Sequence, residues 1–221
     1  MTDAQGAMLA AYAERVPPGR AIVEVGSHHG RSTIVLALCK SRDVRLMAVD
    51  PFEDPYWGGG EGSLPVFLAN LERAGVREEV EFFRGYGEQL ATTWTGDRVG
   101  LLYLDGAHDY RTVDRELGLW FRHLAPGAIV LCHDMFSSHG VTRAAVRQVL
   151  ASRRLSYIER TGSLAAFEYR PLSVTPHVAT LVRLSRELPY FLRNIIVKVA
   201  LRRGWTPVVR ALGHHGDHDP F

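Results

Sequence analysis

Cysteine is scarce in this sequence: only Cys39 and Cys132 occur among its 221 residues. Because both lie in apolar stretches and two cysteines make no disulfide framework, we interpret them as buried thiols of a reducing, cytoplasmic compartment. The first residues lack a basic segment followed by a continuous apolar one, so we expect no signal peptide. No uninterrupted apolar run reaches membrane-spanning length, and a formal net charge of +2 gives no general argument for nucleic-acid binding.

The composition is otherwise that of an ordinary globular protein, with 46% hydrophobic and 23% charged residues. A chain of this length most economically forms one α/β domain with some extra elements. Residues 21–25 are apolar and β-branched, which predicts a strand buried on both faces. Gly26 and Gly30 then bracket a tight turn, and Ser32 opens an apolar helix. Such a strand, turn and helix bring free backbone N–H groups to a ligand at the carboxyl edge of a sheet.

The turn has the spacing E-x-G-x-x-x-G, whereas a dinucleotide-binding turn has G-x-G-x-x-G. It resembles the first motif of the class I S-adenosylmethionine-dependent methyltransferases. The resemblance implies that Gly26 lies against the methionine part of the cofactor and that Glu24 helps to hold its amino group. A glycine-rich turn that binds no ligand would have the same pattern, so this motif alone leaves both interpretations open.

A second buried strand, residues 45–50, ends in Asp50, about twenty residues beyond the turn. A carboxylate at this position can accept hydrogen bonds from the ribose hydroxyls of an adenosine cofactor. The alternative is an aspartate that only caps its own loop. After a third strand, the methyltransferase resemblance places Gly85 and Tyr86 where the chain passes the adenine ring, and an ordinary strand-to-helix turn is again the alternative.

Titratable residues come directly after the fourth and fifth predicted strands. Residues 99–104 lead into Asp105, and residues 128–132 lead into His133 and Asp134. The ends of these strands are neighbours in a doubly wound sheet, so we expect the three side chains to converge at the same edge as the glycine turn. Two carboxylates and an imidazole in one place are costly unless a cation or a substrate compensates them.

The motif DGAHDY at residues 105–110, the Pro-Gly pair before the fifth strand and the His-Asp pair after it are similar to the small metal-dependent O-methyltransferases, including antibiotic- and sugar-modifying members. The similarity covers residues 19–169. It implies that Asp105, His133 and Asp134 hold Mg²⁺, which binds two oxygens of the acceptor. The family commonly has an acidic residue where His133 stands, and imidazole is a softer ligand than Mg²⁺ prefers. His133 is therefore a ligand, a support behind the metal or a base.

Three histidines are candidates for the base of the reaction. Methyl transfer from a sulfonium is an in-line displacement, so the enzyme has to align the acceptor oxygen with the methyl group. A hydroxyl is a poor nucleophile until its proton leaves, and a divalent cation with a nearby base removes that proton. The candidates are His108, His133 and His139, and for each the alternative is a hydrogen-bonded structural histidine.

The fold expected from these elements is α/β. It is a doubly wound, mostly parallel, Rossmann-like sheet of seven strands with an antiparallel last hairpin, followed by a C-terminal helical extension. We expect a methyltransferase domain over residues 1–170 and a basic amphipathic extension with a tail over residues 171–221. The residues assigned to cofactor binding are Glu24, Gly26, Ser27, Gly30, Ser32, Asp50, Gly85, Tyr86 and Asp105.

The extension departs from the family core. Its apolar residues have helical spacing with arginines between them, and Pro189 predicts a kink. Such a surface packs on the core, pairs with another subunit or lies on a membrane, and we favour the first two, with a homodimer expected. Residues 214–219 include three histidines that could bind metal, although a frayed tail is the preferred interpretation. Residues 52–62 form a glycine-rich loop, interpreted equally as a lid or as a loose connection.

The function predicted is Mg²⁺-assisted transfer of a methyl group from S-adenosylmethionine to a small polyhydroxylated acceptor. That acceptor is a sugar or oligosaccharide, with methylmannose polysaccharide assembly as the narrowest case, or a natural product. The alternatives are a regulatory protein that binds the cofactor without catalysis, and a nicotinamide-dependent reductase. The reductase needs Tyr-x-x-x-Lys, which neither Lys40 nor Lys198 provides. Methylation of nucleic-acid amino groups is disfavoured because Asp105 precedes glycine and not Pro-Pro-aromatic.

Overall fold

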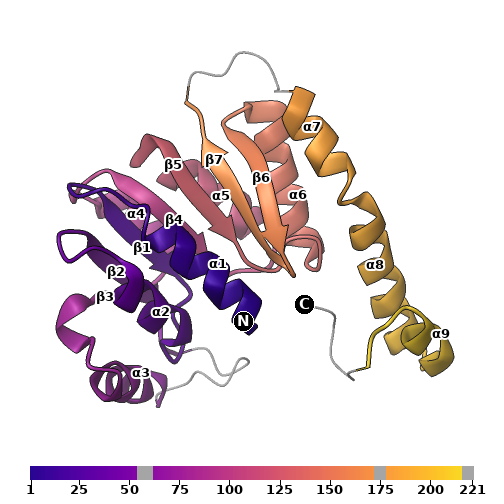
Figure 1. Cartoon of the computed structure of the whole chain (residues 1–221), viewed down its shortest axis with the longest axis horizontal. Helices are drawn as coiled ribbons and strands as arrows, with labels where there is room; N and C mark the ends of the chain where they lie inside the picture. Colours follow the sequence, from indigo (N-terminus) through magenta and orange to yellow (C-terminus); the bar gives the residue numbers. More distant parts are fainter. Residues whose placement is uncertain (54–61, 172–177, 216–221) are drawn as a thin grey trace.

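A seven-stranded β-sheet forms the centre of the molecule, for which the computed structural model describes residues 1–53, 62–171 and 178–215 (Figure 1). The strand order is β3-β2-β1-β4-β5-β7-β6, in which β7 runs antiparallel to both of its neighbours and the first five strands are parallel. The predicted sheet with its antiparallel last hairpin is confirmed. The strands are β1 Ala21–Val25, β2 Arg45–Asp50, β3 Glu81–Arg84, β4 Val99–Leu104, β5 Leu124–Cys132, β6 Leu155–Thr161 and β7 Leu164–Tyr169.

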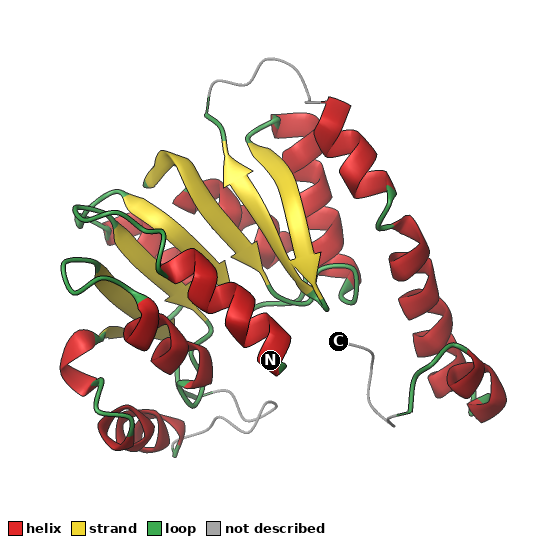
Figure 2. Cartoon of the chain, in the orientation of Figure 1, coloured by secondary structure: helices red, strands yellow, loops and turns green. Residues whose placement is uncertain are grey.

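Helices cover both faces of the sheet (Figure 2). One face packs against the first three helices and the other against the next three. Successive side chains of a strand point to opposite faces, so Ile22 enters one core and Val23 enters the other. Both faces are covered, which explains why the parallel strands read as continuous apolar runs. The helices are α1 Asp3–Ala13, α2 Arg31–Cys39 and α3 Ser63–Arg73 on one face, and α4 Gly87–Thr93, α5 Tyr110–Trp120 and α6 His139–Arg147 on the other.

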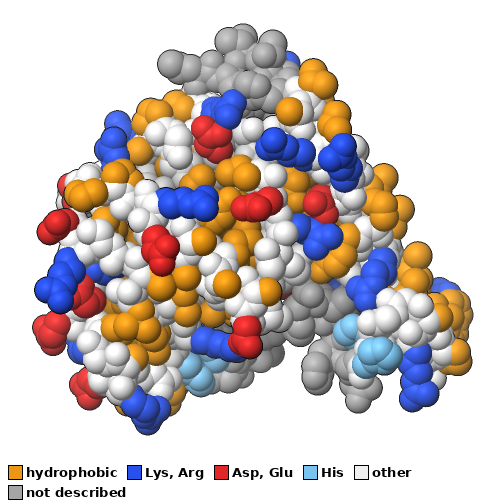
Figure 3. Space-filling view, viewed as in Figure 1, with side chains coloured by type: hydrophobic (Ala, Val, Ile, Leu, Met, Phe, Trp, Pro, Cys, Tyr) orange, Lys and Arg blue, Asp and Glu red, His pale blue; other side chains and the backbone are white. Residues whose placement is uncertain are grey.

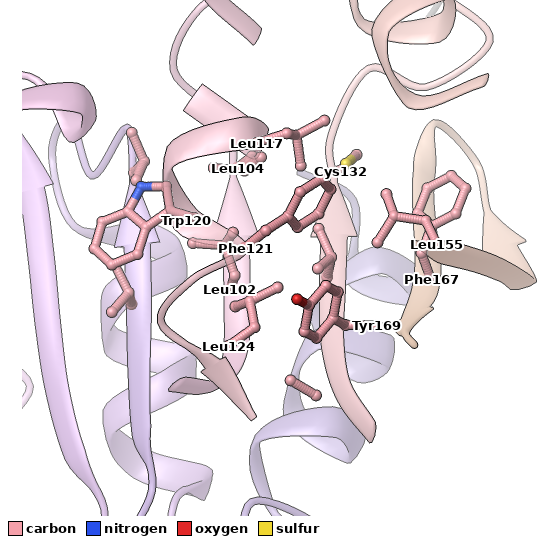
Figure 4. Packing of buried hydrophobic residues seen from close by; sticks show 14 of the residues in the cluster. Leu102, Leu104, Leu117, Trp120, Phe121, Leu124, Cys132, Leu155, Phe167 and Tyr169 are labelled. Atoms are coloured by element: carbon pink, nitrogen blue, oxygen red, sulfur yellow. The ribbon is translucent and has the colours of Figure 1, made fainter. Parts of the chain in front are cut away.

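Two short helical turns complete the core domain: the 3₁₀ turn η2, Arg77–Glu79, and the π-helical turn η3, Gln148–Ser152. The larger core lies between the sheet and α5. Leu117 and Trp120 of α5 are fully buried there against Leu102 of β4 (Figure 4). This packing fixes α5, and with it every side chain that α5 presents to the edge of the sheet.

The register of the strands brings the predicted site residues to one level. Val25 of β1 is paired with Val49 of β2 and with Leu104 of β4, and Leu104 is paired with Cys132 of β5. The next residues along the chain are Gly26, Asp50, Asp105 and His133. They therefore meet at the carboxyl edge of the sheet, as the apolar runs predict.

The C-terminal extension consists of α7 Val178–Ser185, α8 Leu188–Arg202 and α9 Thr206–Ala211. Its first part is attached to the outer strand β6, where Thr180 Oγ1 is 2.7 Å from Ser156 Oγ and Tyr157 donates to Glu187 at 2.7 Å. The predicted kink at Pro189 is a break between two helices, with the proline in the first turn of α8. In Figure 1, α8 and α9 run beyond the edge of the sheet.

The remaining predictions concern the two cysteines, the glycine-rich loop and the histidine-rich tail. Both cysteines are free thiols, with Cys132 buried and Cys39 only half-buried. Most of the expected lid, residues 54–61, lies outside the described residues, as do residues 216–221 of the histidine-rich tail. In the described part of the chain, no helix combines the length and apolar character needed to cross a membrane.

Candidate functional site

A glycine in the turn after β1 lets the ends of neighbouring strands come close together. Gly26 has φ +93°, and a Cβ at this position would lie 2.6 Å from the backbone nitrogen of Gly106 and overlap the carbonyl of Asp105. Its N–H donates to the carbonyl of Val49 at 2.8 Å. Only glycine therefore lets the ends of β1, β2 and β4 approach this closely.

Glu24 lies beneath the turn, fully buried, and accepts a hydrogen bond from Thr33 Oγ1. Burial raises the pKa of Glu24 to about 7, although hydrogen bonds from Ser32, Thr33 and Ser27 act in the opposite direction. The hydrogen bond between Thr33 and Glu24 ties the end of β1 to the start of α2. Gly30 caps α2 with φ +85° and packs against Phe67.

A cavity of about 800 Å³ opens beside the turn, which is the size of a small-molecule site. Glu24, Ser27, Gly30 and Ser32 do not line it, so any effect of these four on a cofactor acts through the shape of the turn. The predicted residues that do line the cavity are Gly26, Asp50, Gly85, Tyr86, Asp105, His108, His133 and Asp134.

Asp50 caps the loops on both sides of it. Its Oδ2 accepts the backbone N–H of His28 at 2.9 Å, and its Oδ1 accepts that of Phe52 at 2.6 Å. A carboxylate oxygen has a second lone pair, so each oxygen can still accept a hydroxyl from the cavity. The two alternatives considered for Asp50, a loop cap and a ligand-binding carboxylate, are therefore compatible in one side chain.

A cluster of two carboxylates and one imidazole lies at the edge of the cavity. Asp105, His108 and Asp134 each place a possible ligand atom within 4.8 Å of the others. His108 Nε2 is 2.7 Å from Asp134 Oδ2, and Tyr103 donates to Asp105 Oδ2 at 2.8 Å. The hydrogen bond with Asp134 raises the pKa of His108 above its usual range. Burial alone would raise the pKa of Asp134, but hydrogen bonds from His108 and His133 hold it well below its usual range.

His133 lies on the buried side of this cluster and is only 8% exposed. Its Nδ1 is 3.1 Å from Asp105 Oδ1 and 3.3 Å from Asp134 Oδ1, which are ion-pair distances, and neither ring nitrogen has a hydrogen-bond partner among the described residues. Burial would lower the pKa of His133, but the attraction of the two neighbouring carboxylates outweighs burial and raises it to about 9. The predicted ligand set thus shares both aspartates with the observed cluster, which has His108 in place of His133.

His139 is separated from the other candidate bases. It is exposed in the first turn of α6 and does not line the cavity. The start of α6 instead supports the loop of His108: Ser138 Oγ donates to the carbonyl of His108 at 3.1 Å, and a Cβ at Gly140 would overlap that carbonyl. This support holds the backbone of the loop that carries His108.

Glu116 is a site residue that the sequence analysis missed. It lies on the buried face of α5, lines the cavity and is 4% exposed. Burial, with a smaller contribution from Glu88, raises the pKa of Glu116 to about 7. A Cβ at Gly87 would overlap its carboxyl group, so the glycine makes room for it. In the sequence, a glutamate at a position of this helix where apolar residues recur could have indicated a side chain of the site.

The donor set of the cluster fits a divalent cation. Carboxylate oxygens suit Mg²⁺ and Mn²⁺, and one imidazole shifts the preference toward the borderline ions. Two neighbouring carboxylates in a partly buried site repel each other unless positive charge is shared between them. Here His133, whose pKa is raised to about 9, supplies part of that charge, and a cation held by neutral His108 and the two carboxylates would supply the rest.

Comparison with known proteins identifies the class. A family model described as a methyltransferase domain matches residues 23–135, which is just over half of the chain. The chain therefore belongs to this methyltransferase family, in agreement with the class I strand order of the sheet. The match includes the glycine turn, Asp50, Asp105 and the His133-Asp134 pair.

Among curated proteins, the chain is 30% identical over 124 residues to the uncharacterized protein y4gI of Sinorhizobium fredii. That match covers 52% of this chain and 13% of the relative, so the chain spans only a small part of the relative's length. A match this short gives no information on the function of the whole relative.

Solved structures show the same fold. An O-methyltransferase from Bacillus cereus in complex with S-adenosylhomocysteine has a TM-score of 0.61 and 20% identity, covering 76% of this chain and 82% of that one. The O-methyltransferase TomG from Streptomyces achromogenes, in complex with S-adenosylmethionine, has a TM-score of 0.59 and 20% identity, covering 76% and 79%. A methyltransferase from Geobacter sulfurreducens has a TM-score of 0.58 and 19% identity, covering 77% and 80%.

Proposed function

We propose that this chain transfers a methyl group from S-adenosylmethionine to a hydroxyl oxygen of a small molecule, with a divalent cation assisting. The observation that carries the proposal is the cluster of Asp105, His108 and Asp134 at the edge of a cavity that begins at the glycine turn. Cofactor-bound O-methyltransferases with the same fold support the choice of donor and of acceptor atom.

The residues of the cavity divide into two groups. Gly26 and Asp50 would hold the cofactor, because the first leaves the turn bare and the second offers carboxylate lone pairs to ribose hydroxyls. The bound cofactor supplies an electrophilic methyl group, whose C–S bond breaks as the new C–O bond forms. Asp105, His108 and Asp134 would hold the cation, which lowers the pKa of the acceptor hydroxyl.

If the two aspartates hold the cation without His108, then His108 is the better placed base of the two histidines in the site. Its side chain is 34% exposed and faces the cavity, whereas that of His133 is 8% exposed and lies between two carboxylates. A proton taken from the acceptor hydroxyl would form an imidazolium at His108, which Asp134 stabilises at 2.7 Å. If His108 is instead a ligand of the cation, His133 holds the two aspartates in position.

The acceptor class follows from the donor set. A cation held by only three protein ligands has positions left for oxygens of the substrate, and two neighbouring hydroxyls can occupy them. Sugars, oligosaccharides and polyhydroxylated natural products have such pairs, and an acceptor of methylmannose polysaccharide assembly is one example. A regulatory protein that only binds the cofactor would have no use for this cluster.

Two measurements test the proposal. Calorimetry should show that S-adenosylhomocysteine binds more tightly than NADH, and the reverse order would contradict the choice of cofactor. Purified protein with isotope-labelled S-adenosylmethionine, Mg²⁺ and a panel of sugars and catechol-like diols should label at least one acceptor. Tight cofactor binding without transfer to any hydroxylated acceptor, in every metal tried, would favour the non-catalytic alternative.

A further inference from the structure

Exposed apolar side chains are concentrated on the C-terminal helices. Nine of the 13 large apolar residues that are exposed in the described chain belong to α7, α8, α9 and their connections. On α8 alone, five aliphatic side chains are 39–54% exposed: Leu188, Leu192, Ile195, Ile196 and Val199. A surface helix does not expose this much apolar area unless something covers it.

These five residues, called here the α8 stripe, follow the spacing i, i+4, i+7, i+8 and i+11 and so form one continuous line along the helix. The opposite side of α8 is already used. Val197 and Ala200 are buried there against Val209 of α9, and the buried Asn194 donates from Nδ2 to the carbonyl of Phe136 at 3.1 Å. The helix therefore cannot turn its stripe toward the core without losing these contacts, which excludes the core-packing interpretation for this face.

The charge on the extension is almost entirely positive. Residues 178–215 contain seven arginines and lysines and a single acidic residue, Glu187. That carboxylate is occupied by Arg160 and by Tyr157. At 3.6 residues per turn, Lys198 and Arg202 border the α8 stripe on one side, and Arg203 lies at its C-terminal end. Figure 3 shows apolar and basic side chains mixed along the outer edge of these helices.

We propose that the α8 stripe and its bordering arginines and lysine bind the surface of an anionic lipid membrane. A helix of this kind lies in the plane of the interface, with aliphatic side chains among the acyl chains and cationic ones among the headgroups. Pairing with a second copy is less favourable, because a two-fold contact along the stripe would bring two basic helices together, and their one acidic side chain, Glu187, is already bonded to Arg160 and Tyr157.

The test uses the full chain and lipid vesicles in a flotation assay. The protein should float with vesicles of 30% phosphatidylglycerol in phosphatidylcholine and much less with pure phosphatidylcholine. Raising the salt concentration from 0.1 M to 0.5 M should weaken the binding, because it shortens the range of the electrostatic attraction. Equal binding to both vesicle types, or no binding to either, would overturn the proposal.

Matched variants separate the stripe from nonspecific effects. The double variant Leu192→Asp/Ile196→Asp should bind the anionic vesicles at least about tenfold more weakly, because two buried aliphatic groups are lost. Leu38→Asp, at a leucine that is 64% exposed on α2, should bind like the wild type. Arg202→Gln and Arg203→Gln should each weaken binding about fivefold. These side chains are exposed, so circular dichroism should show unchanged helices.

Analytical ultracentrifugation distinguishes the second copy from the membrane. The lipid proposal predicts that the wild type and the double variant have the same sedimentation behaviour in the absence of vesicles. A dimer that the double variant converts to a monomer, together with weak vesicle binding, would assign the stripe to a subunit interface and contradict the proposal.

Discussion

Gly26 packs against the backbone of Asp105, so that the turn after β1 and the end of β4 have no room for a side chain between them. We predict that Gly26→Ala lowers the free energy of unfolding through two effects. Alanine at φ +93° costs about 1–2 kcal/mol because of its left-handed conformation. Its Cβ must also push the Asp105 carbonyl away, which adds about 1–3 kcal/mol.

Gly19→Ala is the matched control for this change. Gly19 has φ +76° with no atom within 4 Å of an added Cβ, so it measures the conformational cost alone. Chemical denaturation should show a larger loss for Gly26→Ala than for Gly19→Ala, and only Gly26→Ala should lose affinity for S-adenosylhomocysteine. Equal losses of stability would mean that the contact with Asp105 is unimportant.

Loss of the Asp50 carboxylate should lower the affinity for the cofactor. Asp50→Ala removes a carboxylate that lines the cavity, and hydrogen bonds to a charged group contribute about 1.5–3 kcal/mol, so affinity for S-adenosylhomocysteine should fall at least tenfold. Asp43→Ala, at an exposed aspartate before β2, should leave the affinity unchanged. Calorimetric titration gives both values, and an unaffected Asp50→Ala variant would remove this residue from the cofactor site.

The residues that meet at the carboxyl edge of the sheet could be predicted, because the ends of the strands depend on short-range patterns in the sequence. Apolar runs that stop at Gly26, Asp50, Asp105 and His133 define four strand ends, and parallel strands bring such ends together. Nothing beyond run length and alternation was needed for this step. The same reasoning placed the last hairpin, since β6 and β7 are joined by a glycine turn at Gly162.

The details inside the site depend on packing between distant segments, which a pattern does not contain. The backbone of His108 is held by Ser138 and Gly140 at the start of α6, thirty residues further along the chain. Glu116 enters the cavity only because Gly87 of α4 leaves space for it. Glu24 accepts a hydrogen bond from Thr33 of α2 and is not among the residues that line the cavity, an arrangement that the motif alone does not contain.

The buried Glu116 should make the stability of the folded protein depend on pH. Its pKa is raised from 4.5 to about 7 in the folded protein, so the native state retains a proton that the unfolded chain releases at lower pH. Stability from this residue is therefore present below about pH 4.5 and is lost as the pH rises toward 7. The full loss is of the order of 3 kcal/mol, since one pKa unit corresponds to about 1.4 kcal/mol.

Glu116→Gln removes this titration and should be more stable than the wild type at pH 8, with a smaller difference at pH 5. Glu72→Gln, at an exposed position of α3, is the control and should follow the wild type at both values. Urea denaturation of the ligand-free protein measures the free energies. Glu24 titrates in the same range in both proteins, so the difference between them isolates Glu116. Parallel curves for the wild type and Glu116→Gln would contradict the prediction.

The cluster of Asp105, His108 and Asp134 predicts that activity needs a divalent cation. Chelation should abolish methyl transfer and added Mg²⁺ or Mn²⁺ should restore it, with Mn²⁺ binding more tightly because one of the three ligands is an imidazole. Asp134→Asn should weaken Mn²⁺ binding, measured by electron paramagnetic resonance, at least about tenfold while cofactor affinity changes little.

Asp97→Asn, at an exposed aspartate before β4, is the control and should change neither quantity. Because the resonance measurement does not require turnover, it tests the site even when the acceptor is unknown. Full activity in the presence of chelator, with protein shown to be free of metal, would rule out the cation and leave the His108–Asp134 pair as a general base.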